Sequence, residues 1–128
     1  MTAPSRRPDG LPTHLQHHID GAAVDSVDGA TLQVIDPVTN EPYLTAAAGK
    51  QADVDLAVAA ARRAFTDGPW PGMQARARSK VLHRIADIVA ERNEVLARWE
   101  CCDTGLPISQ ALGQAQRAAE NFRFFADL

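Results

Sequence analysis

The chain has 128 residues, enough for one modest domain, and its 45% hydrophobic and 23% charged content is ordinary for a globular protein. A formal net charge of −3 argues against a dedicated nucleic-acid or membrane-surface binder, which would carry a basic excess. No apolar run approaches the roughly 20 residues of a membrane span, and no apolar segment of a secretory signal follows Arg6-Arg7. We therefore expect a cytoplasmic protein without nucleic-acid or membrane partners.

The first half of the sequence predicts a tail followed by short strands. Residues 1–16 are rich in proline, arginine and polar residues and lack periodicity, so we expect them to form a mobile tail. Asp20-Gly21 then favours a type I′ hairpin turn, with strands on either side from His17 to Val24. Residues 31–36 and 42–48 read as two further strands.

From Gln51 onward the apolar residues recur at helical spacing. A first helix should end at Gly68-Pro69, and a second apolar pattern covers residues 73–102, where Asn93 suits the N-cap of a separate helix. Pro107 fits the first turn of a last helix. The apolar face of that helix is expected to hold Ala111, Ala115, Ala118, Phe122, Phe125 and Ala126.

The order of these elements predicts an α/β fold of short strands and a hairpin, followed by three or four amphipathic helices. A βαβ alternation is missing, so the chain offers no sheet large enough to bury the apolar faces of its helices. That is unusual for a complete domain.

Cys101 and Cys102 are adjacent, so they cannot close an ordinary disulfide loop, and nothing indicates an oxidising compartment. They fall at the C-terminal end of a predicted helix, where the helix dipole disfavours a thiolate, and Glu100 and Asp103 act in the same direction. Cys102 shares a face with Trp99 and should pack as a small apolar residue. We interpret both thiols as structural.

Histidines offer a second possible site. His14, His17 and His18 form a cluster in which metal binding is conceivable, but no cysteine or carboxylate lies at ligand spacing, which favours a solvated tail. His83 lies among charged neighbours in a predicted helix, where a surface position is the simpler interpretation.

Several short motifs, in this order and spacing, resemble the opening of the NAD(P)-dependent aldehyde dehydrogenase superfamily over residues 17–128. They are Ile19-Asp20-Gly21, Ile35-Asp36-Pro37-Val38-Thr39-Asn40-Glu41, Asp53-Val54-Asp55, Trp70-Pro71 and Asp103-Thr104-Gly105. Members are several times longer, so the resemblance implies the N-terminal segment of such an enzyme and an incomplete Rossmann-like cofactor domain. It also implies that the catalytic cysteine, the general-base glutamate and the nucleotide-binding residues lie outside this chain.

Within the superfamily, two stretches resemble the 5-carboxymethyl-2-hydroxymuconate-semialdehyde dehydrogenases of aromatic-acid catabolism. They run over residues 103–110 and 120–126, although Leu106 stands where the commoner family form has lysine. The resemblance implies a small-molecule aldehyde substrate, NAD as cofactor with NADP left open, and a homodimeric or homotetrameric parent enzyme. Betaine-aldehyde and broad-specificity relatives share most of the pattern, and a non-enzymatic helical interaction module is the rival class.

The resemblance suggests two sites. The last helix would border the aldehyde entry tunnel, where Arg117 could bind a substrate carboxylate with two parallel hydrogen bonds and Asn121 is a second candidate. The alternative is that Arg117 pairs with Glu120 on the surface. Asp103, with the backbone carbonyls of Val34 and Ile35, could hold a structural Na⁺ or K⁺; the alternative is that Asp103 caps a turn with Thr104.

Overall fold

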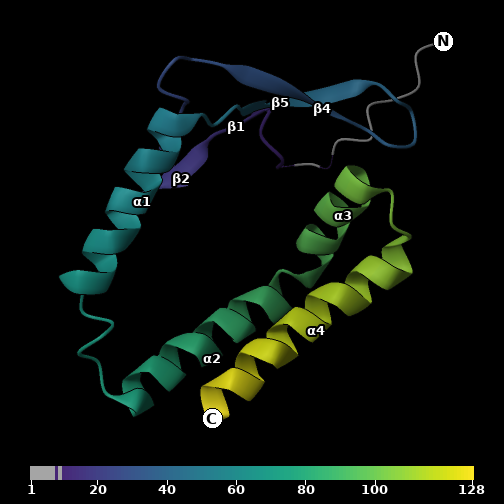
Figure 1. Cartoon of the computed structure of the whole chain (residues 1–128). Coiled ribbons are helices and arrows are strands. Elements are labelled where there is room, and N and C mark those ends of the chain that lie inside the picture. The colour runs from purple at the N-terminus through teal and green to yellow at the C-terminus, as the bar shows by residue number, and fades with distance from the viewer. Residues whose placement is uncertain (1–7, 9) are drawn as a thin grey trace.

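The computed structural model describes residue 8 and residues 10–128, in which short strands precede four helices (Figure 1). The strands are β1 (His14–Leu15), β2 (His17–Ile19), β3 (Ala22–Val24), β4 (Thr31–Ile35) and β5 (Pro42–Ala47). The helices are α1 (Gln51–Thr66), α2 (Ala75–Glu91), α3 (Asn93–Thr104) and α4 (Ile108–Asp127). The expected mixture of strands and helices, with its incomplete sheet, is confirmed.

The strands form two small sheets. β2 and β3 make the predicted hairpin, in which Asp20 and Gly21 both adopt positive φ, at 54° and 78°. The other sheet has the order β1-β5-β4, with β1 parallel and β4 antiparallel to β5. Residues 1–7 and 9, half of the tail expected over residues 1–16, lie outside the described residues. The end of that segment contains β1, whose two residues are too few to show alternation.

α2 and α4 lie side by side, with α3 against the upper part of α4 (Figure 1). Alanines fill the contacts between these helices: Ala86, Ala97, Ala111 and Ala119 are almost completely buried. Small residues let helix axes approach closely, but each buries little apolar area. Among the described residues no large side chain is completely buried, so the core is thin.

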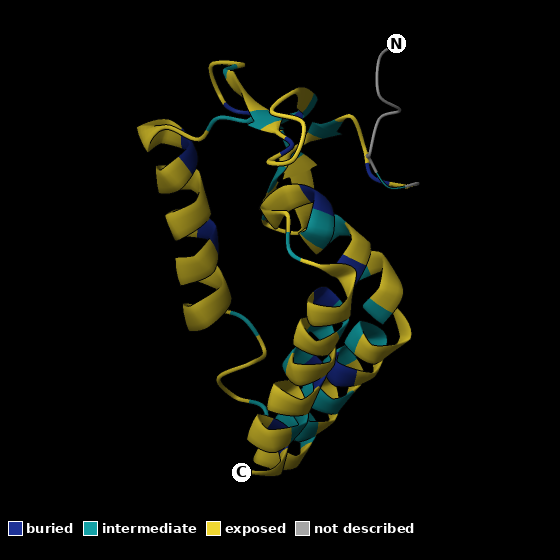
Figure 2. Cartoon of the chain, turned by 90° about the vertical axis from the view of Figure 1, so that its right-hand side faces the viewer, coloured by how far each residue is buried: buried dark blue, intermediate teal, exposed yellow. Residues whose placement is uncertain are grey.

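α1 stands apart from the other helices, and only β2 packs against it to any extent (Figure 1, Figure 2). Of its side chains only Asp53 and Ala60 are buried. Val54, Val58 and Phe65 recur at helical spacing on one side of α1, and each is more than half exposed. This apolar stripe has nothing to cover it within the described part of the chain.

Two details of the predicted helices are wrong. A helix does begin near Asn93, but Arg92 occupies the cap position, and the Asn93 Oδ1 atom is buried without a hydrogen-bond partner among the described residues. Phe122 and Phe125 were expected on the buried face of the last helix, yet they are 36% and 64% exposed. The buried residues of α4 are Ala111, Ala119 and Ala126, of which Ala111 and Ala126 were expected there. Across the described chain, the helices are too short or too polar to serve as membrane spans.

Candidate functional site

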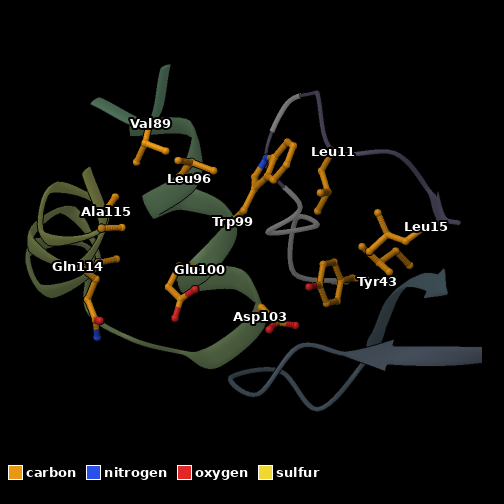
Figure 3. Close-up of a pocket in the computed structure, with 13 residues that line it drawn as sticks. Leu11, Leu15, Tyr43, Val89, Leu96, Trp99, Glu100, Asp103, Gln114 and Ala115 are labelled. Carbon is orange, nitrogen blue, oxygen red and sulfur yellow. The ribbon is translucent and has the colours of Figure 1, made fainter. Parts of the chain in front are cut away.

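A cavity of about 640 Å³ lies between the sheet, α3 and α4 (Figure 3). One face of α3 forms its floor, because Leu96, Trp99, Glu100 and Asp103 recur at helical spacing. The remaining lining comes from the sheet and its approach, α2 and α4: Leu11, Leu15, Tyr43, Leu44, Val89, Ala111, Gln114, Ala115 and Ala118. The walls are therefore mainly apolar, and polar groups gather along α3.

The two carboxylates of the cavity make its electrostatic character negative. Glu100 and Asp103 lie one helical turn apart and are both exposed, and the described lining includes no lysine or arginine. Burial raises the pKa of Tyr43, and the negative charge of Asp103 raises it further. Asp103 is thus close enough to influence groups on β5, and the site suits a cation better than an anion.

The end of α3 brings Asp103 to the turn between β4 and β5. Gly105 adopts the left-handed conformation, with φ of 74°, and its N–H donates to the carbonyl of Cys101. Thr104 Oγ1 donates to the carbonyl of Glu100 at 2.8 Å and accepts from the N–H of Leu106 at 3.2 Å. Thr104 and Gly105 make the described hydrogen bonds of this turn, and the Asp103 side chain contributes none of them.

The cation ligands suggested by the resemblance, Val34 and Ile35, lie at an irregularity of the sheet. Val34 pairs with Leu44 and Ile35 pairs with Pro42, so Tyr43 is the extra residue of a bulge. Pro42 has no N–H to donate to β4. A carbonyl oxygen of β4 that lies opposite Pro42 therefore receives no hydrogen bond from that residue.

Cys101 and Cys102 fall in the last turn of α3, as predicted. Cys102 is buried and Cys101 half-buried, which agrees with packing roles for both thiols. The helix dipole at this end opposes a thiolate, so the geometry does not favour a nucleophile here.

Arg117 and Asn121 lie on the exposed side of α4, and the described lining of the cavity includes neither. Glu120, the expected partner of Arg117, accepts a hydrogen bond from Gln116 Nε2 at 3.0 Å instead. Arg117 makes no ion pair with any described residue. Its guanidinium group is therefore available to a ligand.

The histidines are distributed over separate elements. His14 is on β1, while His17 and His18 are neighbours on β2. Within the described residues, no three His, Cys, Asp or Glu side chains are arranged to hold a metal ion. His83 is half-buried, and its Nε2 lies 2.9 Å from Asp127 Oδ1, so it links α2 to α4.

Two residues of the cavity were not singled out as site residues from the sequence. Tyr43 lies at the bulge between β4 and β5. Its place in the cavity lining depends on a register shift, which is set by the partner strand and is not visible in the sequence around Tyr43. Trp99 was expected only to pack, but its Nε1 atom is buried without a hydrogen-bond partner in the described structure. A tryptophan among charged residues in a helix was the available signal.

Comparison with known proteins gives one consistent result. The family model described as "Aldehyde dehydrogenase family" matches residues 24–128. The chain is 45% identical over 109 residues to aldehyde dehydrogenase 1 of Tanacetum cinerariifolium. These residues are 84% of this chain and 22% of that protein. It is 39% identical over 115 residues to 2-hydroxymuconic semialdehyde dehydrogenase of Pseudomonas sp. (strain CF600), covering 89% of this chain and 24% of that protein.

Solved structures agree. An NAD-dependent aldehyde dehydrogenase from Sinorhizobium meliloti superposes with a TM-score of 0.85 at 36% identity, covering 89% of this chain and 23% of that one. Betaine aldehyde dehydrogenase from Staphylococcus aureus in complex with NAD⁺ superposes with a TM-score of 0.86 at 34% identity, covering 92% and 23%. The chain thus spans between about a fifth and a quarter of the length of these relatives.

Proposed function

The chain belongs to the aldehyde dehydrogenase family, and we propose that it forms the N-terminal part of an enzyme that oxidises an aldehyde to a carboxylic acid with NAD. The superposition on an NAD-dependent aldehyde dehydrogenase over 89% of this chain carries the proposal. The exposed apolar stripe of α1 and the thin alanine core support it, because a larger polypeptide would cover them.

The described residues do not fit an NAD site. A nucleotide phosphate is usually held by a glycine-rich turn between a strand and a helix. The junction of β5 and α1 offers only Gly49, and the side chain of Lys50 there is held by Asp28. We therefore place the cofactor and the reacting thiol in parts of a family-length protein that this chain does not span.

It follows that the 128-residue chain alone should oxidise no aldehyde. The buried Cys102 and half-buried Cys101 lie at the C-terminal end of α3, where the helix dipole disfavours a thiolate. The test is NADH formation, followed at 340 nm, with aliphatic, aromatic and carboxylated aldehydes. An aldehyde-dependent signal that Cys101→Ser or Cys102→Ser abolishes would refute this proposal.

For the substrate we propose a carboxylated semialdehyde, with 5-carboxymethyl-2-hydroxymuconate semialdehyde as the specific candidate. A 2-hydroxymuconic semialdehyde dehydrogenase among the relatives supports this class. A betaine aldehyde dehydrogenase, 39% identical over 110 residues, supports a betaine-aldehyde or broad-specificity enzyme as the alternative. Assembly of the parent enzyme as a homodimer or homotetramer is part of the same proposal.

Arg117 is our candidate for binding the substrate carboxylate, with Asn121 beside it one helical turn later. The support is the exposed position of Arg117 and the absence of an ion pair with any described residue. In a family-length enzyme that carries this chain, Arg117→Ala should raise KM for a dianionic semialdehyde by about tenfold or more. KM for a neutral aldehyde should stay unchanged.

Arg98→Ala is the matched control, because Arg98 is also an exposed helical arginine but lies on α3. It should leave both KM values unchanged. If Arg117→Ala raised KM equally for the charged and the neutral aldehyde, the residue would serve the structure and not the carboxylate.

We also propose that Asp103 and the carbonyls of Val34 and Ile35 hold a Na⁺ or K⁺ ion. The support is the negative cavity and the bulge between β4 and β5. Adding K⁺ to a family-length enzyme in a buffer free of alkali metal should raise its melting temperature, and Asp103→Asn should remove that response. An equal response in both proteins would contradict the site.

A further inference from the structure

The cavity between the sheet, α3 and α4 is filled by nothing in the described part of the chain (Figure 3). Its volume of about 640 Å³ lies within the range of roughly 300–1,000 Å³ that is usual for ligand pockets. Leu15, Val89 and Leu96 line it and keep part of their surface exposed. An occupant that removed these apolar walls from water would stabilise the fold.

The carboxylates of the cavity lie in an unfavourable electrostatic position. Glu100 and Asp103 are one helical turn apart on α3, so their negative charges repel each other. Both lie near the C-terminal end of α3, where the helix dipole is negative as well. The last turn of α3 contains no basic residue that could offset them.

Neither carboxylate is paired with a cation of the described chain. The ion pairs among the described residues all join other groups. The described lining of the cavity contains no lysine or arginine. Glu100 and Asp103 therefore lack a positive charge, which has to come from whatever fills the cavity.

The relatives show where such an occupant is available. Because the matched residues are 22% of one relative and 24% of another, more than three quarters of each relative lies outside the matched part. A segment of the same polypeptide is tethered to the cavity, so its effective concentration there exceeds that of most free ligands. This favours an intramolecular occupant over a small molecule or a second copy.

We propose that the cavity is the docking site of a segment from the remainder of a family-length aldehyde dehydrogenase, and that a lysine or arginine of this segment pairs with Glu100. This inference rests on the proposed function, because it requires the longer polypeptide. Apolar residues of the segment cover the cavity walls. Asp103 stays available for the Na⁺ or K⁺ ion proposed above.

Cysteine labelling of a family-length enzyme that carries this chain tests whether the cavity is filled. Gln114 is exposed on α4 and lines the cavity. Gln114→Cys should react with a maleimide at least about tenfold more slowly in the folded enzyme than in urea, because the segment covers it. Peptide mapping separates this thiol from the others. Equal rates in the two states would show an open cavity and overturn the proposal.

Gln116→Cys is the matched control for the labelling. Gln116 is also exposed on α4, two residues further along, but the described lining of the cavity does not include it. Its labelling should slow much less on folding. Slower labelling of Gln114→Cys that appears only when tetramethylammonium is added would assign the cavity to a small organic cation and refute a docked segment.

The sign of the effect of Glu100→Gln on the melting temperature of the same enzyme tests the ion pair. Without a cation, the change removes a charge from the negative end of α3 and should raise the melting temperature or leave it unchanged. With the proposed pair, it should lower the melting temperature by about 2 °C or more, because a covered cation loses its partner. An unchanged or higher value would overturn the pairing.

Glu120→Gln is the matched control for this charge change. Glu120 is exposed on α4 and accepts a hydrogen bond from Gln116, which a glutamine at position 120 can also accept. Its melting temperature should stay close to that of the parent enzyme. The K⁺ response assigned to Asp103 should persist in Glu100→Gln, and its loss would place the ion on Glu100 and contradict the pairing.

A photoreactive amino acid in place of Gln114 identifies the segment. It should form a crosslink to one peptide of the remainder that contains a lysine or arginine. Replacing that basic residue by glutamine should lower the melting temperature, and adding Glu100→Gln should lower it no further. A crosslink to residues 1–128 of a second copy, a peptide without a basic residue, or additive losses would each refute the pairing.

NADH formation by the same enzyme separates this inference from the proposed function. An active enzyme whose cavity is open would refute the docked segment and leave the proposed function standing. An enzyme with a covered cavity but no activity towards any aldehyde would refute the proposed function instead.

Discussion

Replacing Phe65 by serine tests whether the apolar stripe of α1, exposed in this chain, is covered in a complete enzyme. Phe65 ends the apolar stripe of α1 and is 71% exposed. Phenylalanine and serine have similar helix propensities, so the change alters burial far more than helix formation. In the 128-residue chain, where the side chain is already exposed, the substitution should leave the urea profile of the helical signal almost unchanged, as at most surface positions.

Phe65→Ser should lower the free energy of unfolding more in a protein in which another part covers α1. An aromatic side chain buries roughly 150–250 Å², so the uncovered 71% of Phe65 corresponds to about 140 Å². At about 25 cal/mol per Å², covering that area contributes about 3.5 kcal/mol. A family-length enzyme that carries Phe65→Ser should therefore lose about 3 kcal/mol of unfolding free energy.

Urea profiles followed by far-UV circular dichroism measure both effects. Arg62→Ser, on an exposed and charged position of the same helix, should be nearly neutral in both proteins. If Phe65→Ser had the same small effect in the family-length enzyme as in the 128-residue chain, α1 would not be covered there. The reasoning about its apolar stripe would then be wrong.

Three further outcomes follow from local geometry. Gly105→Ala should destabilise the end of α3 by about 1–2 kcal/mol, because φ is 74° there; a lowered midpoint of the helical signal in a thermal scan would show it. The pKa of Asp53 lies below its ordinary range because backbone N–H groups, first that of Lys50, donate to it. The helical signal of the parent should therefore fall as the pH drops below about 4, and this step should be smaller in Asp53→Asn. Iodoacetamide should label Cys101 faster than the buried Cys102 in peptide mapping, and equal rates would contradict the packing described here.

Local signals predicted most of the secondary structure. Asp20-Gly21 defined the hairpin because a type I′ turn needs positive φ at both positions, and both residues have it. Gly68 and Pro69 ended the first helix, because Pro lacks an N–H and Gly ends helices readily. Such features depend on neighbouring residues only, so the sequence contains them directly.

Features that depend on distant partners were harder to predict. β1 has two residues, and its parallel pairing with Thr45 and Ala46 leaves no periodic pattern. Phe125 looked buried on a helical wheel, but the buried positions of α4 are alanines, and small residues let helices approach closely while the larger phenylalanine stays 64% exposed. The cavity beside Tyr43 likewise arises where β1 and β5 meet residues of α2, α3 and α4, which come together only in the fold.

The two sites suggested by the resemblance differ in how much of their surroundings the described residues supply. Asp103 is drawn to the cavity and to the β4–β5 turn, since the end of α3 reaches both. Arg117 and Asn121 lie on the open side of α4. Binding of a substrate there depends on surfaces that the described residues do not include, so these roles stay predictions.

The central claim is that the apolar faces of these helices lack an adequate partner within the 128-residue chain. Urea unfolding of the purified chain, with binding of a hydrophobic dye measured in parallel, tests it most directly. We predict a broad, weakly cooperative loss of helical signal and strong dye binding before any urea is added. A monomer that unfolds in one sharp transition and binds no dye would contradict the claim and favour a free-standing helical module.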